Sequence, residues 1–138
     1  MSEVAVNGRR LPLSRALVRR VVQGVLQAER RHALISVTFI GRDSMRRLNA
    51  EHTGRDRPTD VLAFPLASPA GDVIGDVYIC PWVARREAQA LGIPLRQELI
   101  RLVVHGTLHA LGRDHPEGPE RTRSDMWRRQ ERYVEALA

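Results

Sequence analysis

Lysine is absent from this sequence, and all 22 basic side chains are arginine. Against 16 acidic residues they give a formal net charge of +6, which favours an anionic partner, most commonly a nucleic acid. A solvated arginine-rich surface, or a bias in genomic base composition, is the alternative explanation. No apolar run approaches the roughly 20 residues that a membrane-spanning helix needs, so we expect no membrane partner.

Cysteine is nearly absent as well. Cys80 is the single cysteine, which excludes an internal disulfide and makes a reducing cytoplasm the expected setting. Because Cys80 follows the apolar run at residues 77–79, we predict a buried side chain rather than a catalytic thiol. The first residues lack a charged segment followed by an apolar one, so no secretory signal is predicted. An arginine-rich transit peptide over residues 9–31 is the alternative.

The pattern of apolar residues predicts one domain over residues 1–138 with a hydrophobic core. Short β-branched runs predict about four strands, at residues 4–6, 35–40, 61–64 (stopping at Pro65) and 73–79. Helical spacing predicts about five helices, at residues 14–26, a short segment capped by Asp43, 82–91, 94–111 and 124–137. Residues 51–60 and 115–119 are predicted loops, and 68–71 a turn. The expected fold class is therefore α/β (α+β), with a single small mixed β-sheet packed against the helices.

Three histidines lie near the end of the helix predicted at residues 94–111. His105 and His109 are four residues apart, so they project from the same face of the helix. Gly112 can adopt the left-handed conformation that ends a helix, and the turn can bring His115 back toward the other two. Three neutral imidazoles can bind one metal ion and leave a fourth position open for water. We therefore predict a site for one Zn²⁺, or another transition metal, at the C-terminal end of this helix.

The composition of the same helix supports this prediction. Residues 99–111 are almost all apolar, which is typical of a helix that runs through a core. Four polar side chains nevertheless share a stripe about 60° wide, and burying them costs free energy unless they have partners; they are Glu98, Arg101, His105 and His109. A bound ion would be the partner of the histidines, whereas local hydrogen bonding of each histidine is the alternative. Asp114 either hydrogen-bonds a ligand imidazole or lies in solvent.

The spacing of the histidines coincides with that of the metzincin proteases, in which the residue after the first histidine is the glutamate general base. Here that residue is Gly106, which accepts no proton, so a zincin-like protease is only an alternative. A metal can still activate water and polarise a phosphoryl oxygen without a glutamate. In the polar loop, Arg55 and Arg57 are candidate catalytic residues that hold a phosphate bidentately. Solvated loop charges are the alternative, and no general base is identifiable.

The segment HGTLHALGRDH at residues 105–115 resembles the signature of the YbeY family of bacterial rRNA maturation factors. The segments PTDVLAFP at 58–65 and GDVYIC at 75–80 also fit this family in order and spacing, so the resemblance covers nearly the whole chain. It implies a single-domain fold with a small mixed sheet, a cytoplasmic protein, and a zinc site formed by His105, His109 and His115. It implies a metal-dependent, single-strand-specific endoribonuclease in 16S rRNA 3′-end maturation and ribosome quality control. It further implies contacts with small-subunit ribosomal proteins and an assembly GTPase.

The sequence departs from the family pattern at one position. The family often has an arginine where this chain has Thr53. If that arginine holds phosphate, its role passes to Arg55 or Arg57, or is missing. A second function therefore stays open, a non-catalytic rRNA-binding assembly factor with a mainly structural zinc. His52, beside Thr53, is considered as a fourth metal ligand but is not predicted to be one.

Overall fold

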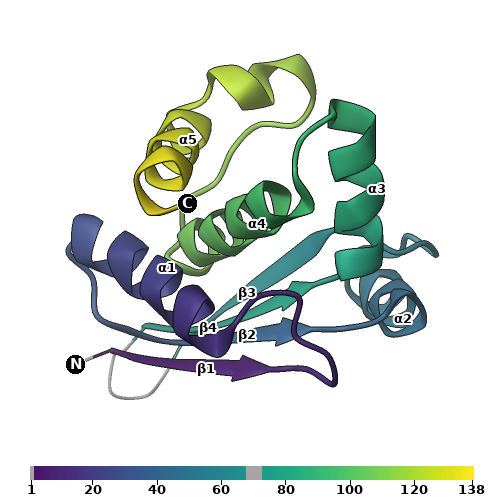
Figure 1. Ribbon diagram of the computed structural model, residues 1–138, viewed down its shortest axis with the longest axis horizontal. Helices are drawn as coiled ribbons and strands as arrows, with labels where there is room; N and C mark the ends of the chain where they lie inside the picture. Colours follow the sequence, from purple (N-terminus) through teal and green to yellow (C-terminus); the bar gives the residue numbers. More distant parts are fainter. Residues whose placement is uncertain (1, 68–72) are drawn as a thin grey trace.

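The computed structural model describes residues 2–67 and 73–138. Four strands form one mixed sheet in the order β1-β2-β4-β3 (Figure 1). The parallel neighbours are β1 (Glu3–Asn7), β2 (Ala33–Phe39) and β4 (Val73–Ile79), and β3 (Val61–Ala67) pairs antiparallel with β4 at the sheet edge. Side chains along β2 alternate between buried and more exposed positions, so one face of the sheet packs against the core.

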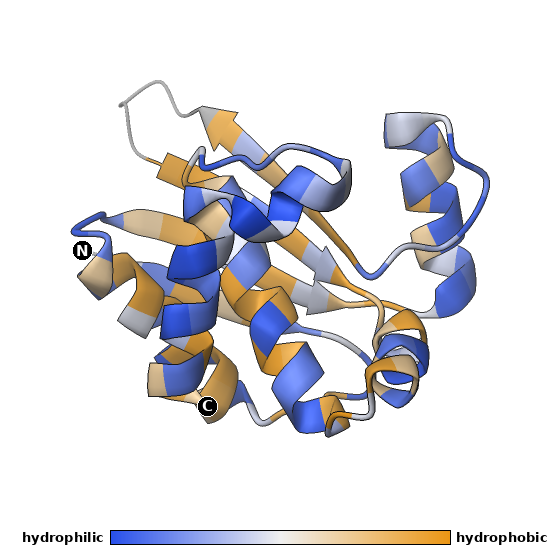
Figure 2. Cartoon of the chain, turned by 90° about the horizontal axis from the view of Figure 1, so that it is seen from above, coloured by the Kyte–Doolittle hydropathy of each residue, from blue (hydrophilic) through white to orange (hydrophobic). Residues whose placement is uncertain are grey.

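Helices cover that face in two layers. α1 (Arg15–Ala28) and α4 (Leu95–Ala110) pack on the sheet, and α5 (Asp125–Leu137) lies over both of them (Figure 1). Apolar and polar residues share most helices, whereas the strands are mainly apolar (Figure 2). The remaining helical segments are α2 (Arg42–Thr53), α3 (Pro81–Leu91) and the 3₁₀ segment η1 (Gly118–Arg123). The prediction of a mixed sheet with about five helices is confirmed.

α4 is the central element, because it contacts the sheet and also α1, α3 and α5. Two glycines let it lie directly against β4. A Cβ atom on Gly106 would come within 2.4 Å of Cγ1 of Val77, and one on Gly75 would come within 2.5 Å of Cβ of Ala110. Real Cβ contacts are not this short, so both positions require glycine in this packing. The last two turns of α4, which carry His105 and His109, are fixed against the sheet in this way.

The boundaries predicted around α2 are wrong at both ends. The helix begins after Gly41, whose carbonyl accepts from the Met45 N–H at 3.0 Å, so Asp43 lies inside the first turn instead of capping it. The carboxylate of Asp43 still interacts favourably with the positive end of the helix dipole there. The predicted loop at residues 51–60 also starts later, because α2 continues to Thr53 and ends at Gly54 in the left-handed conformation.

The prediction that the third strand stops at Pro65 is also wrong. β3 continues to Ala67, and Pro65 pairs with Gly75 of β4. Proline is tolerated here because β3 is an edge strand and need not donate hydrogen bonds on its outer side. The loop predicted at 115–119 gives way to η1 from Gly118, and the turn predicted at 68–71 lies outside the described residues.

Two expectations from the absences in the sequence can be compared with the structure. Cys80 is fully buried at the N-terminus of α3, as predicted, and burial raises the pKa of its thiol. Among the described helices, none is long and apolar enough to span a membrane.

Candidate metal centre

The three predicted histidines converge on one point. One ligand nitrogen from each of His105, His109 and His115 lies within 4.8 Å of the other two. The imidazole centroids are 4.6 Å apart for His105 and His109, 5.2 Å for His105 and His115, and 5.0 Å for His109 and His115. Within residues 2–67 and 73–138, no other group of three potential metal ligands comes together in this way. We call these three residues the histidine cluster, and its donor set suits Zn²⁺.

The end of α4 explains how His115 reaches the cluster. Gly112 has φ +91° and donates its N–H to the carbonyl of His109 at 2.9 Å, while the Arg113 N–H reaches the Leu108 carbonyl at 3.0 Å. These two bonds form a Schellman motif, which reverses the chain after a helix. The predicted role of Gly112 is thereby confirmed. Asp114 is exposed and accepts from the backbone N–H of His115 at 2.8 Å, so it supports the turn rather than an imidazole.

Residues of α5 fix the tautomer of His105. Gln130, with 1% of its surface exposed, accepts a hydrogen bond from Nδ1 of His105 at 2.6 Å. The orientation of this amide is set from its other side, because its Nε2 donates to a carboxylate oxygen of Glu131 at 3.1 Å and a carboxylate can only accept. The proton of His105 therefore resides on Nδ1, and the lone pair of Nε2 is left for a metal. Sequence reasoning placed Gln130 on a helix but gave it no role.

The polar side chains of α4 form hydrogen bonds and ion pairs with α5 as well. Arg101 donates to both carboxylate oxygens of Glu131 at 2.9 and 3.0 Å, and lies 3.9 Å from the buried carboxylate of Glu98. A chain of contacts thus runs from Glu98 through Arg101, Glu131 and Gln130 to His105. No buried side-chain nitrogen or oxygen among the described residues lacks a hydrogen-bond partner. Protein groups, and not only an ion, therefore offset the cost of burying this stripe.

The electrostatics of the cluster favour neutral imidazoles. Burial, followed by the nearby His109, lowers the pKa of His105 to about 4. Burial and the charge of His115 also lower the pKa of His109, against the opposing effects of Asp114 and a hydrogen bond with the backbone of Arg113. A neutral imidazole is the form that binds a metal, so at neutral pH protons do not compete for these two side chains.

Two carboxylates near the cluster were missed by sequence reasoning. Asp60 ends the loop before β3, where its Oδ1 accepts from the Val61 N–H at 2.7 Å, and its charge acts on His105. Burial, together with the charge of Asp60 and a hydrogen bond to it, raises the pKa of Glu87 on α3. At a pKa of about 8, the Glu87 carboxyl is mostly protonated at neutral pH. In the sequence, only the place of Asp60 directly before a predicted strand could have singled it out. No sequence feature singles out Glu87.

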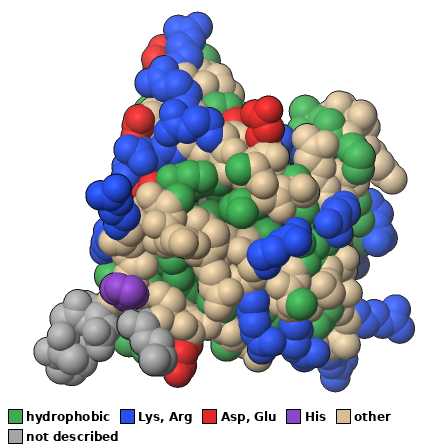
Figure 3. All heavy atoms as spheres, turned by 60° about the vertical axis from the view of Figure 1, so that its left-hand side comes forward, with side chains coloured by type: hydrophobic (Ala, Val, Ile, Leu, Met, Phe, Trp, Pro, Cys, Tyr) green, Lys and Arg blue, Asp and Glu red, His purple; other side chains and the backbone are tan. Residues whose placement is uncertain are grey.

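The two predicted phosphate ligands lie apart from these contacts. Arg55 and Arg57 are exposed in the loop after α2, and over the described part of the chain neither guanidinium forms an ion pair. Thr53 turns its hydroxyl inward to the Asn49 carbonyl at 2.8 Å. His52 lies against the ring of Phe64, with centroids 4.5 Å apart, and is not part of the histidine cluster. On the face in Figure 3, basic side chains lie along the upper left edge and in a second group at the lower right.

Known proteins are similar to this chain over most of its length. The family model described as "Endoribonuclease YbeY" matches residues 7–138. A protein of that name from Thermotoga maritima is 37% identical over 103 residues, which are 75% of this chain and 67% of that protein. One from Chlorobium luteolum is 37% identical over 132 residues, or 95% and 94% of the two chains. The solution structure of a Thermotoga maritima protein superposes with a TM-score of 0.69 at 29% identity, covering 97% of this chain and 88% of that one. The chain therefore belongs to the YbeY family of endoribonucleases.

Proposed function

We propose that the chain is a metal-dependent, single-strand-specific endoribonuclease that acts in the cytoplasm on the 3′ end of 16S rRNA and in ribosome quality control. The observation that carries the proposal is the convergence of His105, His109 and His115 on one point, with Nε2 of His105 left free by Gln130. Family membership and the net charge of +6 support RNA as the substrate. Small-subunit ribosomal proteins and an assembly GTPase are the proposed partners.

Each part of the site has a distinct task in this proposal. The histidine cluster would hold one Zn²⁺, which when bound supplies a Lewis acid for the phosphodiester and lowers the pKa of water. Gln130 holds the ring of His105 in the tautomer and orientation that binding needs. Glu87, with its raised pKa, is a candidate proton donor, and the charge of the neighbouring Asp60 acts on His105. Arg55 and Arg57 would bind the RNA backbone.

Gly106 argues against the alternative of a zincin-like protease. A side chain at this position points away from solvent and into the sheet, where a Cβ atom would meet Val77 at 2.4 Å and Val61 at 3.4 Å. A glutamate general base therefore has no room at the position where those proteases carry it. Phosphodiester cleavage does not depend on that residue.

A second candidate function is that of an rRNA-binding assembly factor with a mainly structural metal. The observation that favours it is the position of Thr53, where the side chain is uncharged and bound to its own helix instead of reaching toward RNA. In this case the metal would stabilise the fold, and RNA binding would persist without cleavage.

A cleavage assay on a single-stranded RNA with the 16S 3′-end precursor sequence distinguishes the two functions. We expect the wild type to cleave it, chelation to stop cleavage, and His109→Ala to lose at least about 100-fold in rate while staying folded. His32→Ala is the matched control, because His32 is exposed and outside the cluster. Equal cleavage by wild type and folded His109→Ala would contradict the nuclease proposal. Metal-dependent folding and RNA binding without cleavage would instead favour the assembly factor.

Analysis of the product ends then identifies the nucleophile. A 2′,3′-cyclic phosphate would show that the RNA 2′-hydroxyl attacks, whereas a 5′-phosphate with a free 3′-hydroxyl would show attack by water.

A further inference from the structure

The C-terminal ends of α1 and α4 lie side by side and are built in the same way. At the end of α1, Arg30 has φ +56° and donates its N–H to the Gln27 carbonyl at 3.1 Å, while the Arg31 N–H reaches the Leu26 carbonyl at 3.0 Å. This is the Schellman pattern already described at Gly112. Arg30 adopts it without the freedom of glycine, at a conformational cost of roughly 1 kcal/mol. Contacts with the rest of the fold must therefore stabilise the turn after α1, because the backbone preference of Arg30 disfavours it.

Two contacts join these helix ends. The carboxylate of Glu29 accepts a hydrogen bond from Nε of Arg113, and Nη1 of Arg31 donates to the carbonyl of Leu111 at 3.5 Å. Residues on either side of Arg30 thus bind the side chain and the backbone of the turn that leads to His115. The contacts span about 80 residues of sequence, so only the fold brings them together.

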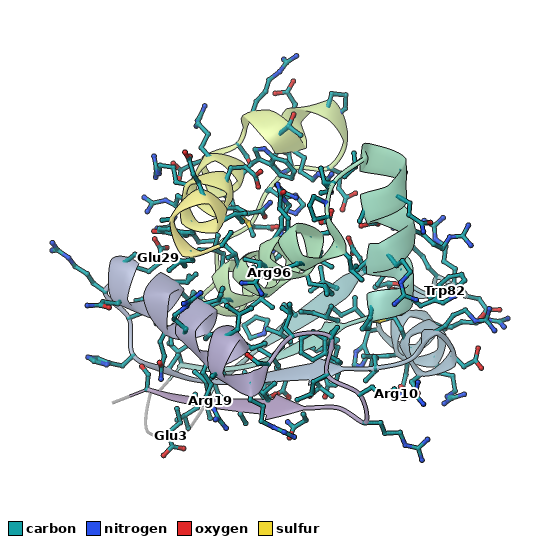
Figure 4. The ribbon with its side chains drawn as sticks, viewed as in Figure 1. Glu3, Arg10, Arg19, Glu29, Trp82 and Arg96 are labelled. Carbon is teal, nitrogen blue, oxygen red and sulfur yellow. The ribbon has the colours of Figure 1, made fainter. Side chains whose placement is uncertain are left out.

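Glu29 is buried and ionised. Its side chain is 3% exposed, and it also accepts from Arg129 at 3.0 Å and from the Tyr133 hydroxyl at 2.5 Å. Burial acts to raise the pKa of Glu29, but hydrogen bonds from Tyr133 and Arg113 outweigh it and hold this pKa below its usual value. The carboxylate lies at the end of α1 beside α5 (Figure 4). A buried charge with three donors holds each of them in a narrow range of positions.

Of these three donors, Arg113 is the one that belongs to the turn of the histidine cluster. It lies between His109 and His115 in the sequence. Its N–H closes the Schellman motif at Leu108, next to the bond from the Gly112 N–H to the His109 carbonyl. Arg129 and Tyr133 both belong to α5 and connect Glu29 with that helix alone.

We propose that Glu29 is a positioning residue for the metal centre. By holding the guanidinium of Arg113, it fixes the turn at residues 112–115 so that His109 and His115 present their nitrogens to a single ion. This inference rests on the proposed metal-binding function. A positioning role for Glu29 differs from a purely structural role in one respect. Loss of its contact with Arg113 should lower metal affinity, whereas loss of its contact with Tyr133 should not.

The test is the Zn²⁺ affinity of the full chain, measured by competition with a chromogenic chelator. We expect Glu29→Gln and Arg113→Gln each to lower the affinity about 10-fold, as is typical when a side chain that orients a metal ligand is removed. The double variant should bind no more weakly than the weaker single variant, because both changes break the same contact. Tyr133→Phe is the matched control and should stay within about twofold of wild type.

A second readout separates positioning from stability. The visible spectrum of bound Co²⁺ reports ligand geometry, and it should change in Arg113→Gln but not in Tyr133→Phe. Should Glu29→Gln fail to fold, Arg113→Gln decides, because the Arg113 side chain is 36% exposed. Wild-type affinity together with an unchanged Co²⁺ spectrum in Arg113→Gln would overturn this inference and leave the proposed function standing. An equal loss of affinity in Tyr133→Phe would do the same. A wild type that binds no metal overturns it together with the proposed function.

Discussion

Two regions of this protein carry the side chains to which the sequence assigns chemistry, and the structure treats them differently. At the end of α4, the Nδ1 atoms of His105 and His115 bond to Gln130 and to the Pro116 carbonyl at 2.6 and 3.0 Å. In the loop after α2, the carboxylate of Asp56 accepts from Arg46 at 2.8 and 2.9 Å, but at Arg55 and Arg57 only backbone groups form hydrogen bonds among the described residues. The Arg57 carbonyl accepts from Asn49 at 2.8 Å, and the Arg55 N–H reaches the Thr53 hydroxyl at 3.3 Å.

The difference shows how far each kind of element can orient its side chains before a ligand binds. A helix packed on both sides directs its side chains to fixed points and surrounds them with partners, as a site for a small ion requires. A surface loop leaves long side chains free, which suits contact with a flexible polyanion but loses more conformational entropy on binding.

Adding a side chain at Gly106 should have the largest effect, because it disrupts the packing of α4 against β4. We expect Gly106→Ala to lower the free energy of unfolding by roughly 1–3 kcal/mol, since overpacking against Val77 forces the helix or the strand to move. Gly106→Glu should lose still more, because it buries a charge as well. Urea unfolding measures both.

Gly41→Ala is the control for Gly106→Ala. Nothing lies within 4 Å of the added Cβ atom at Gly41, so its effect should stay under about 1 kcal/mol. A second variant, Val77→Ala, should recover part of the loss when combined with Gly106→Ala. Equal stability of Gly106→Ala and wild type would show that α4 can move away from Val77 at little cost.

Removing the partner of His105 should weaken metal binding next most strongly. Gln130→Leu leaves Nδ1 of His105 without its acceptor, so we expect the Zn²⁺ affinity to fall about 10–100-fold. Competition with a chelator measures this change. Gln23→Leu on the exposed face of α1 is the control for added apolar surface. Unchanged affinity in Gln130→Leu would mean that packing alone orients the ring.

The metal-free protein should lose stability in acid because of the same burial. His105 has a pKa of about 4 in the folded state and about 6.5 when unfolded. The unfolded state therefore binds more protons between these values, and stability rises with pH from 4 to 6.5 and is then constant. We expect roughly 2 kcal/mol less stability at pH 5 than at pH 7.5 from this group.

Urea unfolding of chelator-treated protein across this pH range gives the measurement. His105→Gln removes the titrating group, so its stability should depend less steeply on pH than that of the wild type. Parallel curves for the two proteins would assign the acid sensitivity to other groups.

The contrast between the two regions also explains what the sequence predicts and what it does not. The convergence of the histidines follows from helical spacing and from the conformational freedom of Gly112, both of which are local properties. Their metal binding stays a prediction. The roles of Gln130 and Glu29 depend on contacts over 25 and 84 residues of sequence, and that of Glu87 on its contact with Asp60, none of which local patterns contain.

Errors at element boundaries have the same origin. The sequence predicts that Pro65 ends a strand, because proline cannot donate to a ladder. Whether a strand lies at an edge depends on the order β1-β2-β4-β3, which local patterns do not contain. The fold class needs less information, since the number and type of elements suffice to predict a mixed sheet covered by helices.

The smallest expected effect is that of the loop arginines on RNA binding. Replacing Arg55 and Arg57 together by glutamine should lower the affinity for a single-stranded RNA a few-fold. It should also reduce the slope of log affinity against log salt by about 1.4, since each phosphate contact contributes about 0.7. Fluorescence anisotropy at several salt concentrations measures both quantities. The pair Arg9→Gln and Arg10→Gln is the matched control, because those residues are also exposed and adjacent in a loop. If the two pairs change the slope equally, binding follows overall charge and the loop after α2 has no special place in it.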